Sequence, residues 1–181
     1  MAVMIRPATR ADMACICGIY AYYVENTVIT YEETAPDVDE MQQRFFDIQS
    51  HNMPYLVAEI DGVITGYAYA SVYRTRPAYR YCVEHSIYLS QNHQGHGIGS
   101  KLMEALIDAC LPTGIRQMVA VISDTTNHAS VTLHEKFGFT HVGILKDSGF
   151  KFNRWIDTII MQRPIGAGAT SLPTGKGLNL K

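Results

Sequence analysis

The sequence predicts an α/β (α+β) fold in which about four helices flank one central, mixed and twisted sheet of about six or seven strands. Three observations support this prediction. An Asp-Gly dipeptide at 61–62 separates two β-rich runs and marks an antiparallel hairpin. A strand-like run at 82–89, a glycine cluster and an amphipathic segment then follow one another, and a compact apolar run at 118–122 supplies the next buried strand.

Pattern and punctuation place the elements along the chain. Thr9 can cap the first helix, and Asp37 with Glu40 three positions later forms a capping-box-like start for the second. Asn127 can cap the last helix, which Gly138 terminates. The expected elements are strand 3–6, helix 10–24, a second helix ending before Pro54, strands 55–60, 63–73 and 82–89, a helix after Gly99, strand 118–122, a helix over 127–137, and strands 140–145 and 155–161.

The composition favours one globular domain that binds a small molecule. With 181 residues, of which 47% are hydrophobic and 18% charged, the chain can bury a sizeable core. The formal net charge of -2 and the lack of a polybasic run argue against nucleic acid and anionic lipid as partners. Residues 1–163 are expected to form the domain, and residues 164–181, rich in Gly, Pro, Ser and Thr, a C-terminal tail.

The cysteines and the apolar runs exclude further classes of protein. Cys15, Cys17, Cys82 and Cys110 include no CxxC pair and follow no secretory signal, so neither a disulfide framework nor a zinc knuckle is expected. No apolar run approaches the roughly 20 residues that a membrane span needs. We therefore expect reduced thiols, a cytoplasmic location and no membrane contact.

The glycine-rich segment is the most informative part of the sequence. Gly95, Gly97 and Gly99 let the backbone approach a ligand closely, and the helix that follows leaves its first N–H groups free to hold an anion. The partial positive charge of a helix start adds to these donors. The pattern predicts a pyrophosphate site held by Gln94, Gly95, His96, Gly97, Ile98, Gly99 and Ser100.

Other motifs fit this segment poorly. A dinucleotide fingerprint needs GxGxxG after the first strand and an acidic residue about 20 positions on, whereas here the third glycine comes one residue early and the corresponding region, Met118–Ile122, is apolar. A Walker A loop would end in Gly-Lys-Ser/Thr, and Gly99-Ser100-Lys101 reverses that order. His93 and His96 have no Cys or carboxylate at zinc spacing, so no metal is assigned. A nicotinamide oxidoreductase stays an alternative that failure to bind NAD would remove.

The segment around the glycine loop resembles a known signature. Tyr88-Leu89 followed by His93–Gly99 is similar to the acyl-CoA motif of the GNAT N-acetyltransferases, a Q/R-x-x-G-x-G/A pattern that follows the fourth strand and opens the third helix. The similarity extends from about Ile5 to Gln162. The segments that resemble the phosphinothricin and methionine-sulfoximine acetyltransferase branch are 83–88, 127–139, 142–143 and 149–157.

The resemblance implies a GNAT fold, acetyl-CoA as cosubstrate and acetyl transfer to the α-amine of a small amino-acid analogue. That acceptor would be of the phosphinothricin, methionine sulfoximine or methionine sulfone type. The resemblance and the aromatic residues within 67–81 and 150–155 also suggest a homodimer. Two other functions stay open: a GNAT enzyme that acetylates a protein or peptide amine, and a non-catalytic acetyl-CoA-binding module.

Two side chains could carry the proton transfers of such a reaction. The amine must be neutral to attack, and the departing thiolate must be protonated or stabilised. Strand alternation puts Glu84 on the same face as Tyr88, where it is either an ordinary solvated carboxylate or, as the resemblance implies, the catalytic base. His134 is either a partly exposed helical histidine or, by the resemblance, a catalytic group that assists proton removal or protonates the CoA sulfur.

Further cofactor contacts are expected on the last helix and on the strand before the glycines. Asn127 can serve as a helix N-cap, and the resemblance gives it a hydrogen bond to the pantetheine arm. Ser130 and His134 lie close to the same helix face. A bulge could free the Leu89 amide to polarise the thioester carbonyl. The strand residues expected beside the cofactor are Ile87, Tyr88 and Leu89.

The acceptor pocket is expected from the loop after the first helix and from the Arg- and Tyr-rich loop at 73–80. An arginine can hold a carboxylate or phosphinate through two parallel hydrogen bonds, so Arg74 and Arg80 are candidates for recognising the acceptor. Tyr31 and Phe152 are candidate walls of the pocket. Exposed loop arginines are also commonly just solvated, and that alternative stays open.

Overall fold

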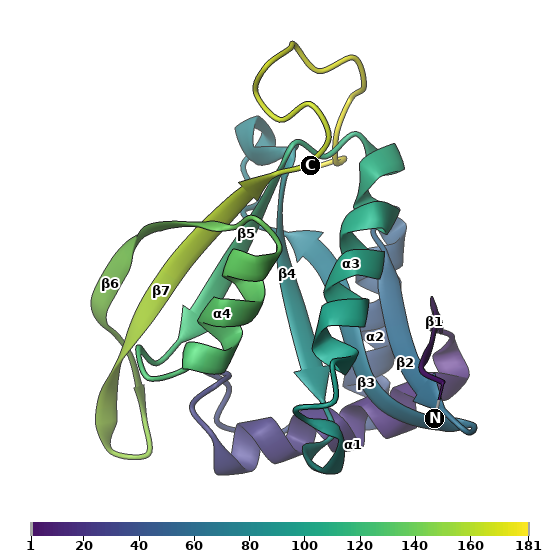
Figure 1. Ribbon diagram of the computed structural model, residues 1–181, viewed down its shortest axis with the longest axis vertical. Coiled ribbons are helices and arrows are strands. Elements are labelled where there is room, and N and C mark those ends of the chain that lie inside the picture. Colours follow the sequence, from purple (N-terminus) through teal and green to yellow (C-terminus); the bar gives the residue numbers. More distant parts are fainter. Residues whose placement is uncertain (1, 181) are drawn as a thin grey trace.

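The computed structural model describes residues 2–180 and contains one seven-stranded sheet with strand order β1-β2-β3-β4-β5-β7-β6 (Figure 1). Neighbouring strands pair antiparallel, except that β4 and β5 pair parallel. This mixed sheet with helices on both faces confirms the predicted fold class. The elements are β1 (Met4–Pro7), α1 (Met13–Asn26), α2 (Val38–Ser50), β2 (Tyr55–Ile60), β3 (Val63–Val72), β4 (Cys82–Leu89), α3 (Ile98–Cys110), β5 (Gln117–Ser123), α4 (His128–Lys136), β6 (Thr140–Lys151) and β7 (Arg154–Pro164).

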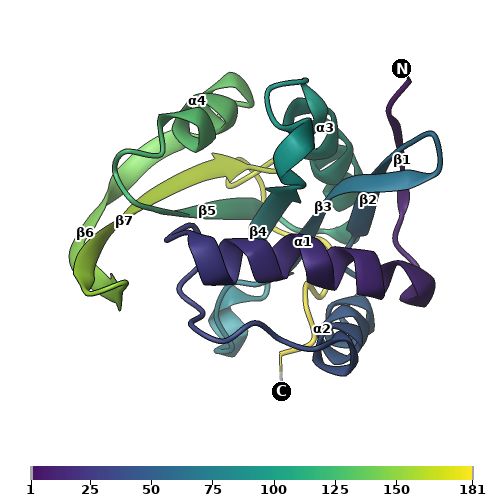
Figure 2. The same ribbon diagram turned by 90° about the horizontal axis from the view of Figure 1, so that it is seen from below.

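The helices cover the sheet on two opposite faces. Figure 2 shows α3 and α4 above the sheet and α1 and α2 below it. On the α3 face the core is aliphatic, with Leu102 and Leu106 packed on the sheet at helical spacing. On the α1 face it is rich in aromatic rings, including Tyr20, Phe45 and Tyr67. Because successive strand residues alternate between these faces, each side chain of β4 lies in one of two different environments.

The sheet divides between its two central strands. In the described chain β4 and β5 pair at Cys82–Gln117, Val83–Met118 and Glu84–Val119, and beyond these pairs the strands diverge (Figure 1). β4 stays paired with β3 as far as Leu89, and β5 stays paired with β7 along its whole length. The divergence therefore leaves the facing backbone edges of β4 and β5 open between two intact half-sheets.

The closing strands are longer than the sequence predicts. The strand expected at 140–145 continues as β6 to Lys151, and its partner β7 runs from Arg154 to Pro164. Register shifts at His141/Gly143 and at Leu145/Gly149 absorb the irregular residues, after which pairing resumes. The glycine and polar residues that suggest a break thus lie inside a bulged hairpin.

Two predicted helix starts also need correction. The helix expected at Arg10 begins with a 3-10 turn over Arg10–Asp12, and α1 starts after it because the Asp12 carboxylate binds the Thr9 amide at 2.7 Å. Asp37 caps α2 as predicted by accepting from the Glu40 amide at 2.8 Å. The Glu40 carboxylate does not close a capping box, because it accepts a hydrogen bond from Arg44 instead.

The segment after β7 packs back onto the domain. Ile165 and Leu178 are buried in the core on the α3 face. The Leu178 amide donates to the Arg80 carbonyl at 2.8 Å, and the Arg116 guanidinium donates to the Gly168 carbonyl at 3.2 Å. A few apolar anchors and backbone hydrogen bonds thus hold a segment of low hydrophobicity. No helix within residues 2–180 has the length and apolar character to cross a membrane.

Candidate active site

A cavity of about 470 Å³ lies where β4 and β5 part. Its floor is the open strand edge, and its walls are the start of α3 and one face of α4. The residues that line it are Tyr23, Ile29, His85–Leu89, Gln94, Gly95, Gly97, Gly99, Ser100, Ala120–Ser123, Asn127, Ala129, Ser130, Thr132–His134 and Lys136. A cavity of this size with backbone amides at one end suits a long, phosphorylated cofactor.

The glycine loop supplies the amide end of the cavity. Gly95 and Gly97 have φ of +78° and +76°, in the left-handed region that side-chain-bearing residues rarely adopt. Gly97 caps α3, and its carbonyl accepts from the Lys101 amide at 3.2 Å, which is the first turn of the helix. The amides of residues 98–100 precede that bond and have no carbonyl partner within the helix. They can therefore bind an anion such as a pyrophosphate.

The edge of β4 supplies backbone groups to the middle of the cavity. The Ser90 amide donates to the Thr65 carbonyl on the β3 side at 2.9 Å, so alternation turns the backbone groups of Leu89 and Ile87 toward β5. Since β5 has already diverged, these groups face the cavity. The β3–β4 register is continuous over the strand, so the divergence exposes the Leu89 amide and the predicted bulge is not needed.

Tyr23, which sequence reasoning missed, joins α1 to this edge. Its hydroxyl donates to the Leu89 carbonyl at 2.6 Å and accepts from the Gln94 side chain at 3.0 Å. The tyrosine therefore fixes both the end of β4 and the entry to the glycine loop. In the sequence it is one of several tyrosines on an amphipathic helix, and nothing local distinguishes it.

Helix α4 contributes a polar wall. The Asn127 side-chain oxygen accepts from the Ser130 amide at 3.3 Å, which leaves the amide NH2 group of Asn127 as the donor available to a ligand. Lys136, a second residue missed by the sequence analysis, donates to the Ser100 hydroxyl at 3.2 Å. This places a cation beside the free amides of α3, where it can balance phosphate charge.

Glu84 and His134 lie on opposite faces of the sheet. Glu84 shares its face with Tyr88, whose ring packs on Tyr20 of α1 at 5.1 Å, whereas His134 lies on α4. Glu84 is half-buried, and burial raises the pKa of its carboxyl above the usual value. It does not line the cofactor cavity itself. The carboxylate therefore faces the α1 side of the split sheet, and the imidazole faces the cofactor side.

His134 is paired with a second buried histidine. Its Nε2 lies 3.0 Å from Nε2 of His85, and its Nδ1 lies 2.6 Å from the Ser130 carbonyl. Burial lowers the pKa of both imidazoles, and the nearby His134 lowers that of His85 further. For His134 the bond to Ser130 partly opposes this shift. Both rings are therefore neutral at pH 7.

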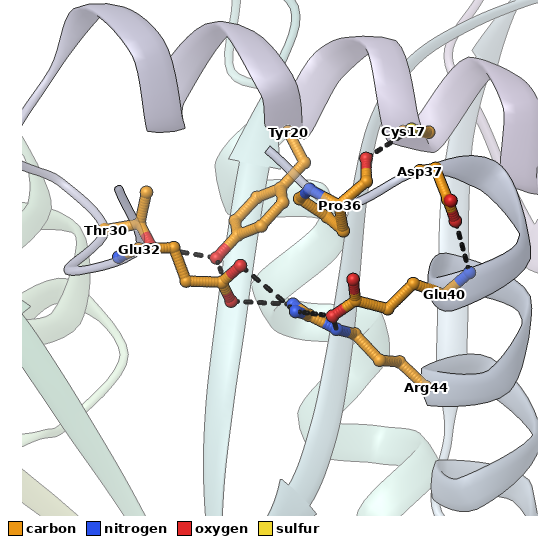
Figure 3. A network of polar contacts seen from close by, with 8 residues as sticks. All are labelled: Cys17, Tyr20, Thr30, Glu32, Pro36, Asp37, Glu40 and Arg44. Atoms are coloured by element: carbon orange, nitrogen blue, oxygen red, sulfur yellow. Dashed lines mark hydrogen bonds and ion pairs between the residues drawn. The ribbon is translucent and has the colours of Figure 1, made fainter. Parts of the chain in front are cut away.

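Hydrogen bonds fix the loop between α1 and α2 on the Glu84 face (Figure 3). Tyr20 of α1 bonds the Thr30 hydroxyl at 2.8 Å and the Glu32 carboxylate at 2.9 Å. Arg44 of α2 binds the two Glu32 oxygens at 2.6 and 3.1 Å. Figure 3 shows these side chains converging below α1. From the other side Lys151 of β6, only 2% exposed, donates to the Thr30 carbonyl at 2.9 Å.

The predicted acceptor residues lie in three places. Tyr31 belongs to the pinned loop, bonds the Thr158 hydroxyl of β7 and packs its ring over Gly149. Phe152 lies in the exposed β6–β7 turn, with its ring 5.1 Å from the Lys151 ammonium. Arg74 and Arg80 are exposed in the connection that leads into β4, each beside a neighbouring tyrosine ring, at 5.2 and 5.8 Å. The structure does not bring these four residues together.

Some predicted cofactor residues have other surroundings. His96 is exposed and lies outside the cavity lining, and the Ile98 side chain is fully buried in the core, so only its amide is available to a ligand. The strand β5, which forms the opposite wall, was not predicted to take part. Its small residues, including Ala120 and Ser123, carry no motif that sequence reading could use.

This combination of a split mixed sheet and a glycine-capped helix at the split defines the class of protein. The family model for the acetyltransferase (GNAT) domain matches residues 5–160. The chain therefore belongs to the GNAT acetyltransferase family and is an N-acetyltransferase. Enzymes of this family use acetyl-CoA as cosubstrate.

Relatives of the phosphinothricin branch are similar over nearly the whole chain. The phosphinothricin N-acetyltransferase of Alcaligenes faecalis is 44% identical over 95% of this chain and 87% of its own. The L-methionine sulfoximine/L-methionine sulfone acetyltransferase of Salmonella typhimurium is 40% identical over 87% of this chain and 92% of its own. The crystal structure of a phosphinothricin acetyltransferase from Sinorhizobium meliloti in complex with AcCoA matches with a TM-score of 0.93 and 46% identity, covering 98% and 96% of the two chains.

Proposed function

We propose that this enzyme acetylates the α-amine of a small amino-acid analogue of the phosphinothricin, methionine sulfoximine or methionine sulfone type. The observation that carries the proposal is the position of Glu84 at the last β4–β5 pair, on the face opposite the cofactor cavity. A carboxylate there can take a proton from an amine that approaches the split from the α1 side. The similarity to the relatives described above supports the choice of acceptor.

The pinned loop supports a small acceptor over a protein amine. Arg44 and Lys151 hold residues 30–32 from opposite sides, so the α1 face is covered next to the split. A protein substrate would need an open groove there. Tyr31, Arg74, Arg80 and Phe152 remain our candidates for contacts with the acceptor, and the arginines would pair with its carboxylate or phosphinate.

The chain's own groups divide the work between cofactor and acceptor. The amides of residues 98–100 with Lys136 would hold the pyrophosphate, and Asn127 the pantetheine arm. The Leu89 amide would polarise the thioester carbonyl. Acetyl-CoA supplies an activated acyl group with a thiolate leaving group. Glu84 would accept the amine proton, and His134, on the cofactor side, would serve the departing sulfur rather than the amine.

An acceptor panel tests this function. We expect the purified enzyme to acetylate L-phosphinothricin, L-methionine sulfoximine or L-methionine sulfone with kcat/KM at least about 100-fold above that for peptides with a free N-terminal amine, as judged by mass spectrometry of the products. Faster acetylation of the peptides would contradict the proposal. Binding of acetyl-CoA without turnover of any acceptor would favour a non-catalytic module instead.

We also propose that the enzyme is a homodimer built on the β6–β7 hairpin. β6 is an edge strand with a largely exposed surface, and no helix covers it in the described chain. Apolar side chains gather there at exposures that a monomer would leave to water. They are Val142, Ile144, Leu145, Phe150 and Trp155, of which Val142 and Trp155 are 60% and 63% exposed.

Sedimentation of a matched pair of variants tests the dimer. Trp155→Glu should shift the enzyme to a monomer, because it puts a charge into the shared apolar surface. Leu172→Glu changes a residue that is 87% exposed in the C-terminal segment and should leave the mass unchanged. A wild-type monomer would reject the proposal. We place the dimer in the cytoplasm, since all four cysteines are unpaired.

A further inference from the structure

Two buried histidines meet at the wall of the cofactor cavity. His85 of β4 is 6% exposed, His134 of α4 is 5% exposed, and both line the cavity. Their ring centroids are 4.9 Å apart, and Phe139 packs against both rings at 5.3 and 5.0 Å. The sequence analysis assigned a role to His134 and none to His85.

The hydrogen bonds fix the tautomer of each ring. A carbonyl oxygen only accepts, so Nδ1 of His134, at 2.6 Å from the Ser130 carbonyl, must carry a proton. In the neutral ring Nε2 of His134 then carries none. Nε2 of His85, at 3.0 Å, must therefore be the donor in the bond between the rings. Direction passes from the Ser130 carbonyl through His134 to His85.

The far nitrogen of His85 completes this chain of bonds. Its Nδ1 is left without a proton, and among the described residues it is one of two buried side-chain polar atoms that have no hydrogen-bond partner. The other is the Ser123 hydroxyl, which also lines the cavity. A proton on His134 Nε2 would force the His85 proton onto Nδ1, where it would have no acceptor. The pair is thus held in one protonation pattern.

Charged groups around the pair do not favour a cation either. Glu84 precedes His85 but points to the opposite face of β4. On α4 the nearest charge is Lys136, which is bonded to Ser100, and on β7 it is Arg163, whose guanidinium lies 6.0 Å from the Phe139 ring centroid. Both are positive and would oppose protonation of the imidazoles.

We propose that His85 is a positioning residue that acts through His134: its Nε2–H bond holds His134 as the neutral Nδ1–H tautomer in a fixed orientation at the cofactor cavity. This inference rests on the proposed function, in which His134 serves the leaving sulfur. Because its Nε2 lone pair is occupied, His134 cannot act as a free base toward the acceptor amine. The amine proton is left to Glu84.

The tautomers can be measured without turnover. Long-range ¹H–¹⁵N correlation spectra of histidine-labelled enzyme should show His134 as Nδ1–H and His85 as Nε2–H, both neutral well below the pH at which an exposed histidine titrates. An Nε2–H tautomer for His134, or a charged pair at pH 6, would overturn the proposal. This outcome is independent of whether the acceptor has been identified correctly.

Two variants separate positioning from packing. His85→Gln keeps an N–H donor near the position of Nε2, whereas His85→Leu fills similar space without a donor. We expect His85→Leu to lower kcat about tenfold with an unchanged KM for acetyl-CoA, and His85→Gln to recover most of the loss. Thermal stability should rank the other way, since leucine removes a buried nitrogen that has no partner. Equal kcat in the two variants, or a higher kcat for leucine, would overturn the proposal.

Discussion

The two faces of the split sheet are built to meet ligands in different ways. On the α3/α4 face the contacts come mainly from backbone, with the amides of residues 98–100 and the open edge of β4. On the α1/α2 face they come from side chains that distant segments bring together, such as Glu32 with Arg44 and Lys151 with Thr30. The cofactor face is therefore generic in chemistry, whereas the acceptor face can change with single substitutions.

The largest effect is expected from Glu84→Gln. Loss of the base should lower kcat/KM for the acceptor by about 10²- to 10³-fold, while acetyl-CoA binding measured by calorimetry stays within about twofold. Wild-type kcat/KM should fall as pH drops through the raised pKa of this carboxyl. Full activity of the variant across the pH range would show that Glu84 is not the base.

Stability should change in the opposite sense in the same variant. A carboxyl with a raised folded-state pKa binds more protons when folded than when unfolded, so it lowers the free energy of unfolding as pH rises above its usual value. Glu84→Gln should therefore have a higher Tm than wild type at pH 7 and little difference at pH 4. An unchanged Tm at pH 7 would mean that the carboxylate is well solvated.

Gly97→Ala tests the backbone side of the comparison. A side chain at φ +76° costs about 1–2 kcal/mol and displaces the free amides, so KM for acetyl-CoA should rise about tenfold. Gly114→Ala is the matched control, because Gly114 has φ +81°, has open space around it and lies outside the cavity. It should lose similar stability with no change in KM. Equal KM values would remove the loop from the cofactor site.

Tyr23→Phe should have a smaller effect, because it removes one hydroxyl that joins the end of β4 to Gln94. We expect KM for acetyl-CoA to rise about fivefold and kcat to fall less, as for the loss of about 1 kcal/mol of hydrogen bonding. Tyr22→Phe, on the neighbouring residue outside the cavity lining, should be silent. Steady-state kinetics on both variants would distinguish a local contact from a general effect on α1.

Lys136→Gln should have the smallest effect, since this exposed cation adds only screened attraction to phosphate. The Kd for CoA should rise about threefold at low salt, and the difference should vanish near 0.5 M salt. Lys101→Gln makes the same charge change on an exposed residue of α3 outside the cavity lining and should alter Kd less. Equal effects would indicate a general charge field instead of a contact.

The contrast between the faces also explains what sequence reading could predict. The glycine loop and the Asn127 cap are local signals, because backbone conformation and helix ends depend on neighbouring residues. Tyr23 and Lys136 were missed because their partners, Leu89 and Ser100, are 66 and 36 positions away. Nothing in the local pattern of either residue specifies such a contact.

The same limit applies to strand β6 and to His85. Gly149 suggests the end of a strand, yet it lies where the ring of Tyr31 packs and where pairing resumes after a bulge. His85 falls on the buried face of β4 by alternation, and only the fold shows that His134 meets it there. Side chains that act in pairs across the sheet need the tertiary structure to be recognised.

A crystal structure of the enzyme with CoA tests the central claim most directly. We expect the pyrophosphate within hydrogen-bonding distance of the amides of Ile98, Gly99 and Ser100, and the pantetheine arm along the open edge of β4 beside Leu89. Phosphates bound away from the start of α3, or a β4–β5 split that closes without the ligand inside it, would contradict the account.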